Sequence, residues 1–189
     1  MAHDAHDDKN NSVFKITLNL VVTCFISGII IATAFAITEP VAAEQRVKAK
    51  NDAMKELVKD AETFKAIDGK EGWYAALKGG KVIAYVVPAN SKGYGGNIEM
   101  LAAVTPEGKT MDFKVLKHNE TPGLGDKMVE PKFRNQFANK DPKDLEVVKV
   151  PTDKNIQALT GATITSRAVT KGVKEAVEAV AAYSATQKK

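Results

Sequence analysis

The feature that most constrains this chain is an uninterrupted apolar stretch near its start. Residues 16–38 read ITLNLVVTCFISGIIIATAFAIT, 23 residues without a charged side chain between Lys15 and Glu39. At about 1.5 Å of rise per residue, a helix of this length crosses the ~30 Å hydrocarbon core of a bilayer with room for tilt. We therefore expect one transmembrane helix over residues 16–38.

A cleaved signal peptide is the alternative explanation for this stretch. Ala34-Phe35-Ala36 resembles an A-x-A cleavage site. The apolar run is longer than the usual ~7–15 residues of a signal peptide, however, and the leader before it is acidic rather than basic. The sequence favours an uncleaved anchor.

The charges that flank the stretch bear on its orientation. Lys9 and Lys15 precede it, whereas four basic residues follow it within reach of the positive-inside rule. The four are Arg46, Lys48, Lys50 and Lys55. A charge count alone therefore places the C-terminal side of the helix in the cytoplasm.

Cysteine and charge exclude several classes of function. Cys24 is the only cysteine, so the chain has no internal disulfide, no CxxC zinc site and no four-cysteine iron–sulfur site. Two of its three histidines, His3 and His6, lie in an acidic stretch near the N-terminus that we expect to be a flexible tail, and no metal site is expected. The net charge of +4 comes from scattered residues, which does not indicate nucleic-acid binding.

The rest of the 189 residues is long enough for one domain. Hydrophobic periodicity predicts a helix over residues 41–66, a short helix over 131–138 and a clear amphipathic helix over 166–183. Segments rich in Val, Ile, Tyr and Phe between turn signals predict strands. These strands are 73–77, 81–87, 98–105, 111–117 and 145–150.

The fold class expected is α+β, an antiparallel sheet with flanking helices that follows one transmembrane helix. The corresponding organisation is a cytoplasmic tail over residues 1–15, the anchor over 16–38, a connecting helix over 39–66 and an extracytoplasmic domain over 67–189.

The stretch LTGATITSRAV, residues 159–169, crowds four hydroxyl side chains at the start of the last predicted helix. One hydroxyl is enough to cap a helix, by accepting a hydrogen bond from a backbone N–H that the first turn leaves unpaired. A helix start also binds phosphate, because its free N–H groups and its dipole present positive charge. From this stretch alone, the cap is the favoured interpretation.

Two glycine-rich loops accompany the hydroxyl cluster: KGYGGN at residues 92–97 and HNETPGLGD at 118–126. Each taken separately is explained as a turn. Glycine also lets the backbone approach a flat ligand closely. Together with a candidate phosphate site, the two loops suggest one ligand that has a phosphate group and a flat ring.

HNETPGLG, GYGG and TGATITS, in one chain with an N-terminal membrane helix, resemble the FMN-binding domain of the G subunit of the Rnf electron-transport complex. The C subunit of the sodium-pumping NADH:quinone reductase is a related member of this family. The resemblance covers nearly the whole chain. It implies an FMN attached covalently by a phosphoester to Thr163, the last threonine of TGAT, and installed by a separate flavin transferase.

The resemblance and the residue types together suggest which side chains surround the cofactor. Hydroxyls near the attachment site would bind phosphate oxygens or cap the helix, and the HNETPGLG loop would lie against the ring. These cofactor-binding candidates are Thr160, Gly161, Ala162, Thr165, Ser166, Glu120, Thr121, Gly123, Leu124 and Gly95. The pattern that the transferase recognises commonly has Asp where this chain has Gln157, which bears on the efficiency of attachment.

The function that the resemblance implies is electron transfer within a membrane ion-translocating ferredoxin:NAD oxidoreductase. The partners would be the other Rnf subunits, the flavin transferase and membrane lipid. The N-terminus would be cytoplasmic and the flavin domain would lie on the outer face of the cytoplasmic membrane, contrary to the charge count. The alternatives are a stand-alone membrane-anchored flavoprotein reductase and a membrane-tethered binding or assembly module without flavin.

Overall fold

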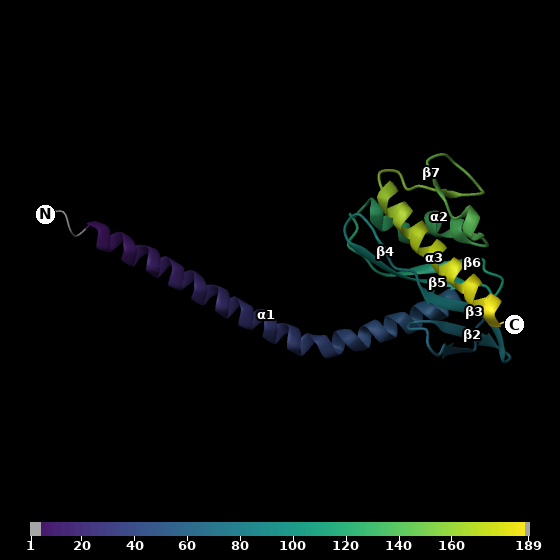
Figure 1. Ribbon diagram of the computed structural model, residues 1–189, viewed down its shortest axis with the longest axis horizontal. Helices are drawn as coiled ribbons and strands as arrows, with labels where there is room; N and C mark the ends of the chain where they lie inside the picture. The colour runs from purple at the N-terminus through teal and green to yellow at the C-terminus, as the bar shows by residue number, and fades with distance from the viewer. Residues whose placement is uncertain (1–4, 188–189) are drawn as a thin grey trace. The chain divides into compact units, whose positions relative to one another are not determined.

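The computed structural model describes residues 5–187, with side chains from residue 13 onward (Figure 1). His3 and the side chain of His6 lie outside this description. The chain divides into two compact units, one that ends at Lys48 and one that spans Ala49–Lys189. Helix α1 (Ala5–Leu57) forms the first unit and contributes its last residues to the second.

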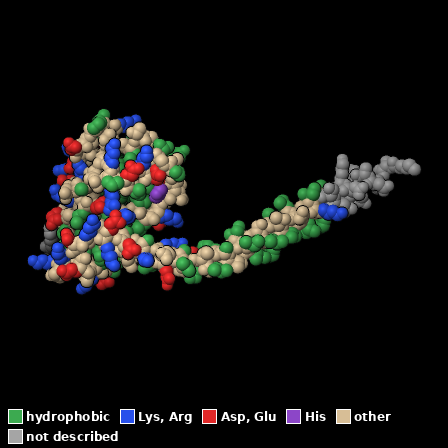
Figure 2. Space-filling view, turned by 180° about the vertical axis from the view of Figure 1, so that it is seen from behind, with side chains coloured by type: hydrophobic (Ala, Val, Ile, Leu, Met, Phe, Trp, Pro, Cys, Tyr) green, Lys and Arg blue, Asp and Glu red, His purple; other side chains and the backbone are tan. Residues whose placement is uncertain are grey.

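The first unit carries the uncharged stretch as part of α1. Among the described residues, α1 is the one helix long and apolar enough to cross a membrane by length and composition. Apolar side chains cover the visible face of this stretch in Figure 2. The hydroxyls of Thr23, Ser27 and Thr33 donate to the carbonyl four residues earlier, which satisfies them within the helix. These three hydroxyls are therefore satisfied without water, as the apolar interior of a bilayer requires.

The second unit is built on an antiparallel six-stranded sheet. Its strands are β1 (Thr63–Ala66), β2 (Tyr74–Lys78), β3 (Lys81–Pro88), β4 (Ser91–Lys92), β5 (Asn97–Val104) and β6 (Thr110–Lys117). The strands from β1 to β3 pair in sequence order, and β5 pairs with β3, β4 and β6. β3 and β4 thus lie end to end along one side of β5, and the turn between β4 and β5 projects from the sheet.

Both faces of this sheet are buried, as the alternation along β5 shows. Ile98, Met100 and Ala102 belong to a core cluster shared with the C-terminal helix, α3 (Thr163–Gln187). Leu101 and Ala103 belong to a second cluster on the opposite face. The last residues of α1 and those just after it complete that second cluster, namely Ala53, Met54, Leu57 and Val58. The period of two that defines a strand therefore places one set of side chains against α3 and the other against α1.

Short elements connect β6 to α3 on the side of the sheet that α3 covers (Figure 1). They are η1 (Gly125–Val129), α2 (Pro131–Arg134), η2 (Asn135–Phe137), η3 (Pro142–Asp144), β7 (Val147–Val148) and β8 (Ile156–Gln157). Phe133 and Phe137 from these elements stack edge-on in the core, and Phe137 contacts Phe113 of β6 at a ring distance of 4.8 Å. These aromatic contacts fix the connecting segment to the sheet.

The expected α+β class with an antiparallel sheet is confirmed, but several element boundaries differ. A helix is expected over residues 41–66, but α1 ends at Leu57. The last four residues of the expected range, Thr63–Ala66, form β1. This segment is a strand because β2 offers it a partner and Phe64 packs on the sheet, neither of which local composition reveals. The strand expected over 145–150 is reduced to the two residues of β7.

The helices after the sheet also differ from the expected ranges. The helix expected over 131–138 is α2 followed by the 3₁₀ turn η2. The final helix begins at Thr163 rather than near Ser166. The TGAT element therefore runs directly into the helix, and its last threonine is the first helical residue.

A network of charges joins the end of α1 to the sheet and to α2. Arg134 binds both carboxylate oxygens of Asp112, at 2.8 and 2.6 Å, and also donates to Glu56 at 3.0 Å. Lys114 donates to the other oxygen of Glu56 at 2.7 Å. The hydrogen bonds from Lys114 and then from Arg134 hold the pKa of Glu56 below its ordinary value of 4.5. Glu56 follows the uncharged stretch by more than a dozen residues and belongs to the second unit.

We predict that Glu56→Gln lowers the free energy of unfolding at neutral pH. The loss should be at most about 1 kcal/mol, because the side chains of Glu56 and Lys114 are both substantially exposed. The pKa of Glu56 is lower in the folded chain than in the unfolded chain. The carboxylate therefore stabilises the fold at pH values above its ordinary pKa, and this stabilisation is lost as the pH falls through the lower pKa of the folded chain. Urea unfolding of the detergent-solubilised chain at several pH values measures the difference.

Glu175→Gln is the matched control, since it breaks an exposed pair with Lys171 at 3.8 Å on one face of α3. The control variant should change the free energy of unfolding less at neutral pH. A difference between Glu56→Gln and the wild type that persists unchanged in acid would contradict the assignment.

Candidate functional site

Three segments far apart in the sequence meet at the carboxylate of Glu120. The side chain is buried, with 5% of its surface exposed. Its Oε1 accepts a hydrogen bond of 2.9 Å from the backbone N–H of Gly95, in the turn between β4 and β5. Its Oε2 accepts a hydrogen bond from the hydroxyl of Thr165, in the first turn of α3. Glu120 itself lies in the loop after β6, so one side chain joins the GYGG, HNETPGLG and TGATITS segments.

Three glycines of these motifs pack closely around this contact. A Cβ atom on Gly93 would lie 2.3 Å from Oε1 of Glu120, and one on Gly125 would lie 2.8 Å from the Cβ of the same residue. A Cβ on Gly95 would lie 1.8 Å from the backbone oxygen of Asn119. These glycines are thus required for the approach of the three segments to one another, rather than to a ligand.

The loop that carries Glu120 is held in a tight turn. The N–H of Leu124 donates to the carbonyl of Thr121 at 3.2 Å, and Gly123 between them has φ of 76°. Pro122 followed by a glycine with positive φ is the sequence typical of a type II turn. At the start of the loop, Nδ1 of His118 accepts the N–H of Glu120 at 3.3 Å. Backbone geometry on both sides therefore fixes the position of Glu120.

The TGAT element forms a second tight turn. The N–H of Ala162 donates to the carbonyl of Leu159 at 3.0 Å, and Gly161 has φ of 79°. The buried hydroxyl of Ser166 donates to the carbonyl of Ala162 at 3.0 Å and accepts from the N–H of Leu159 at 2.9 Å. Ser166 thus holds both ends of the turn from inside α3.

The turn leads into the first turn of α3, whose backbone amides are unpaired. Within the described part of the chain, the N–H groups of Thr163, Ile164 and Thr165 have no hydrogen-bond partner, and neither does the hydroxyl of Thr163. Unpaired amides and the helix dipole make this end of α3 positive. The half-buried hydroxyl of Thr163 therefore lies where a negatively charged phosphate would be stabilised.

An open cavity of 560 Å³ adjoins this helix start, within the size range of ligand sites. It is lined by Tyr94, Glu120, Thr121, Leu124, Gly125, Gly161, Ala162, Thr163, Ile164 and Thr165. Exposed apolar side chains lie around it: Tyr94 is 72% exposed, Ile164 55% and Leu124 43%. A phosphate-binding helix start beside exposed apolar side chains suits a ligand with a phosphate and a flat ring.

Most of the predicted site residues surround this one cavity. Glu120, Thr121, Leu124, Gly161, Ala162, Thr163 and Thr165 line it. Four do not: Gly95 lies behind Glu120, Gly123 is at the tip of its turn, Ser166 is behind the TGAT turn, and Thr160 lines a neighbouring hollow.

Sequence reasoning missed three lining residues, Tyr94, Gly125 and Ile164. Each of the three belongs to one of the motifs. The signal that could have revealed Tyr94 and Ile164 is a large apolar side chain among residues that are otherwise small or polar.

The hydroxyl groups differ from expectation in what they bind. Thr165 and Ser166 were expected to donate to phosphate oxygens or to cap the helix. Thr165 donates to Glu120 instead, and Ser166 donates to the backbone of the turn. The backbone amides at the start of α3 are therefore available to a phosphate, whereas the hydroxyls of Thr165 and Ser166 are already engaged.

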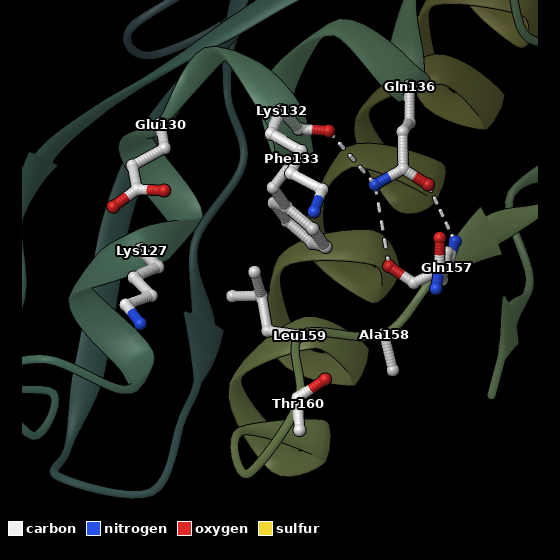
Figure 3. Close-up of a pocket in the computed structure, with 9 residues that line it drawn as sticks. All are labelled: Lys127, Glu130, Lys132, Phe133, Gln136, Gln157, Ala158, Leu159 and Thr160. Carbon is white, nitrogen blue, oxygen red and sulfur yellow. Dashed lines mark hydrogen bonds between the residues drawn. The ribbon is translucent and has the colours of Figure 1, made fainter. Parts of the chain in front are cut away.

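The neighbouring hollow, of 230 Å³, lies against the segment that precedes the TGAT turn (Figure 3). There the side-chain amide of Gln136 binds the backbone of Gln157 twice, accepting its N–H at 2.7 Å and donating to its carbonyl at 3.4 Å. The side-chain amide thus binds both backbone groups of one residue, as a neighbouring strand would, and it fixes the chain just before Leu159. Lys127 and Lys132 also line this hollow.

Comparison with known families gives one domain match. The FMN-binding domain family matches residues 93–178, a range that begins at the GYGG turn and ends within α3. All three motif segments that meet at Glu120 fall inside this range.

Curated relatives match the chain over nearly its full length. The G subunit of a proton-translocating ferredoxin:NAD(+) oxidoreductase complex from Clostridium ljungdahlii is 60% identical, over 95% of this chain and 98% of the relative. The G subunit of a Na(+)-translocating complex of the same kind from Acetobacterium woodii is 31% identical, over 87% and 92%. Among solved structures, Shewanella oneidensis NqrC has a similar fold, with a TM-score of 0.51 and 22% identity over 68% of this chain and 73% of that one.

The packing around Glu120 predicts that Gly95→Ala destabilises the protein by about 1–3 kcal/mol, because its methyl group would overlap the backbone of Asn119. Gly123→Ala is the matched control: it lies in open space, and only its positive φ opposes the substitution, at about 1–2 kcal/mol. Thermal unfolding of both variants measures the comparison. Equal losses in the two variants would contradict the proposed close approach.

Proposed function

Because this chain belongs to the family formed by the G subunits of Rnf-type ion-translocating ferredoxin:NAD oxidoreductase complexes, we propose that it transfers electrons within such a complex through a bound FMN. The match to the FMN-binding domain supports the choice of cofactor. The cavity beside α3 is the site we assign to it, since it combines a phosphate-binding helix start with exposed apolar side chains.

We further propose that the FMN is attached by a phosphoester to the hydroxyl of Thr163. The observation that carries this assignment is the environment of the four candidate hydroxyls. Thr165 and Ser166 are buried and engaged in hydrogen bonds, and Thr160 faces the neighbouring hollow. Of these four hydroxyls, which all lie in the described part of the chain, that of Thr163 is the one that is free of hydrogen bonds and also lines the FMN cavity.

The chain's own groups have separate tasks in this site. The phosphodiester retains one negative charge, which the start of α3 stabilises by roughly 0.3–1 kcal/mol, or more where it is partly buried. Tyr94, Leu124 and Ile164 offer apolar contacts to the ring. The flavin supplies the electron-accepting chemistry, while the protein orients the ring and sets its electrostatic surroundings.

The remaining assignments follow from the family resemblance. A separate flavin transferase would attach the cofactor, and the other Rnf subunits and membrane lipid would surround the anchor. The flavin domain would lie on the outer face of the membrane, since large domains are translocated largely regardless of local charge. A covalent bond has a clear use there, because a flavin that dissociated would be lost from the cell.

We predict that Thr163→Ala abolishes covalent flavin after co-expression with the transferase, measured as fluorescence of the denatured chain in a gel. Thr163→Ser retains the hydroxyl and should retain flavin. Thr160→Ala is the matched control, since it removes an exposed hydroxyl three residues away, and it should also retain flavin. Fluorescence that persists in Thr163→Ala and disappears in Thr160→Ala would refute the assignment.

The proposed place in a complex has its own test. A tagged chain purified in mild detergent from membranes that contain all Rnf subunits should bring down several integral membrane proteins together with ferredoxin-dependent NAD⁺ reduction. Recovery of a fluorescent chain alone, with reductase activity toward a soluble acceptor, would favour the stand-alone reductase instead.

A further inference from the structure

We propose that Glu120 lowers the reduction potential of the flavin, in addition to joining the three motif segments. The inference rests on the proposed function, because it concerns the cofactor assigned to the cavity. Glu120 is the one charged side chain among the described residues that line this cavity. Its carboxylate forms no ion pair with any described Lys, Arg or His side chain.

The two hydrogen-bond donors to the carboxylate of Glu120 are neutral groups, and the first turn of α3, to which Thr165 belongs, adds only the partial positive charge of a helix start. Both of its oxygens accept hydrogen bonds, one from the amide of Gly95 and one from the hydroxyl of Thr165. The neighbouring imidazole of His118 accepts the backbone N–H of Glu120 through Nδ1 and forms no ion pair with the carboxylate. Lys127 and Lys132 line the other hollow, across the TGAT segment.

Burial increases the effect of this charge on the cavity. Water screens an exposed carboxylate, but Glu120 is 5% exposed and is enclosed by Gly93 and Gly125 as well as by its donors. In such surroundings the effective dielectric constant falls, and a fixed charge acts over several ångströms. Any ring in contact with the cavity wall is therefore exposed to a negative potential.

Reduction of the flavin adds charge of the same sign. Two electrons from the low-potential donor of the complex, a ferredoxin-class protein, and one proton from solvent convert neutral oxidised FMN into a ring with one negative charge. A fixed negative charge on the wall opposes this step, because it raises the free energy of the reduced form relative to the oxidised form. The positive start of α3 acts at the phosphate, whose charge does not change in the reaction.

The test is a spectroelectrochemical titration of the flavinylated full-length chain in detergent. Glu120→Gln removes the charge and keeps the shape, since the amide oxygen accepts from Gly95 and the NH₂ group donates to Thr165. Its midpoint potential should rise, with about a tenfold or larger increase in the ratio of reduced to oxidised flavin at a fixed electrode potential. Glu130→Gln is the matched control: it removes an exposed carboxylate that lines the other hollow, and the potential should not change.

Thr165→Val supplies a second variant in case Glu120→Gln does not fold. It removes the hydroxyl donor and preserves the side-chain shape, which leaves the carboxylate less compensated, so the potential should fall below that of the wild type. An unchanged potential in either Glu120→Gln or Thr165→Val, or a shift of both in the same direction, overturns the proposal.

The proposed attachment and the proposed role of Glu120 fail in different ways. The same samples are denatured and examined for in-gel flavin fluorescence before titration. Absence of covalent flavin in the wild type contradicts the proposed attachment. Normal flavin content with potentials that do not differ between the wild type and Glu120→Gln contradicts only the role of Glu120.

Discussion

The site depends on the two hydrogen bonds that the buried carboxylate of Glu120 accepts. One comes from a hairpin turn of the sheet and the other from the first turn of the C-terminal helix, so a single side chain determines the spacing of three loops. The cavity is lined by these three loops, whose relative positions the two hydrogen bonds fix. The glycines on all sides of Glu120 follow from the same constraint, since any Cβ there would separate the segments.

The loop that carries Glu120 and the start of α3 bring opposite electrostatic features to this one cavity. Ile98 and Met100 of β5 pack against α3, and this contact fixes the start of the helix next to the turn between β4 and β5. The unpaired amides of the first helical turn favour a phosphate. Glu120 faces the rest of the cavity with negative charge. A ligand with an anionic phosphate and a ring whose charge changes on reduction would meet both features within this cavity.

Much of this arrangement could be predicted from the sequence because the relevant signals are local. The uncharged run of residues 16–38, the apolar segments between turn signals and the stripe of Val residues in α3 each indicate their structure without tertiary information. β1 could not be predicted in this way, since Thr63–Ala66 is a strand only because β2 pairs with it. The start of α3 was also misjudged, as Thr163 and Ile164 are β-branched and are poor helix formers on propensity alone.

The roles of individual site residues required long-range contacts that a sequence does not display. The TGATITS hydroxyls are equivalent by type, yet Ser166 holds the turn, Thr165 binds Glu120 and Thr163 is free. Gly95 seemed suited to a ligand and instead donates to a carboxylate 25 residues away. The three motifs do lie together in the fold, but the contacts of each member depend on neighbours that are distant in the sequence.

The central claim is that Thr163 carries the flavin, and peptide mapping tests it most directly. Trypsin cleaves after Lys154 and Arg167, so one peptide contains all four hydroxyls of the TGATITS segment. Fragmentation of this peptide from the mature protein should place the mass of FMN less one water on Thr163, with Thr160, Thr165 and Ser166 unmodified. FMN mass on any of those three residues, or a peptide without added mass in a protein that still binds flavin, would contradict the claim.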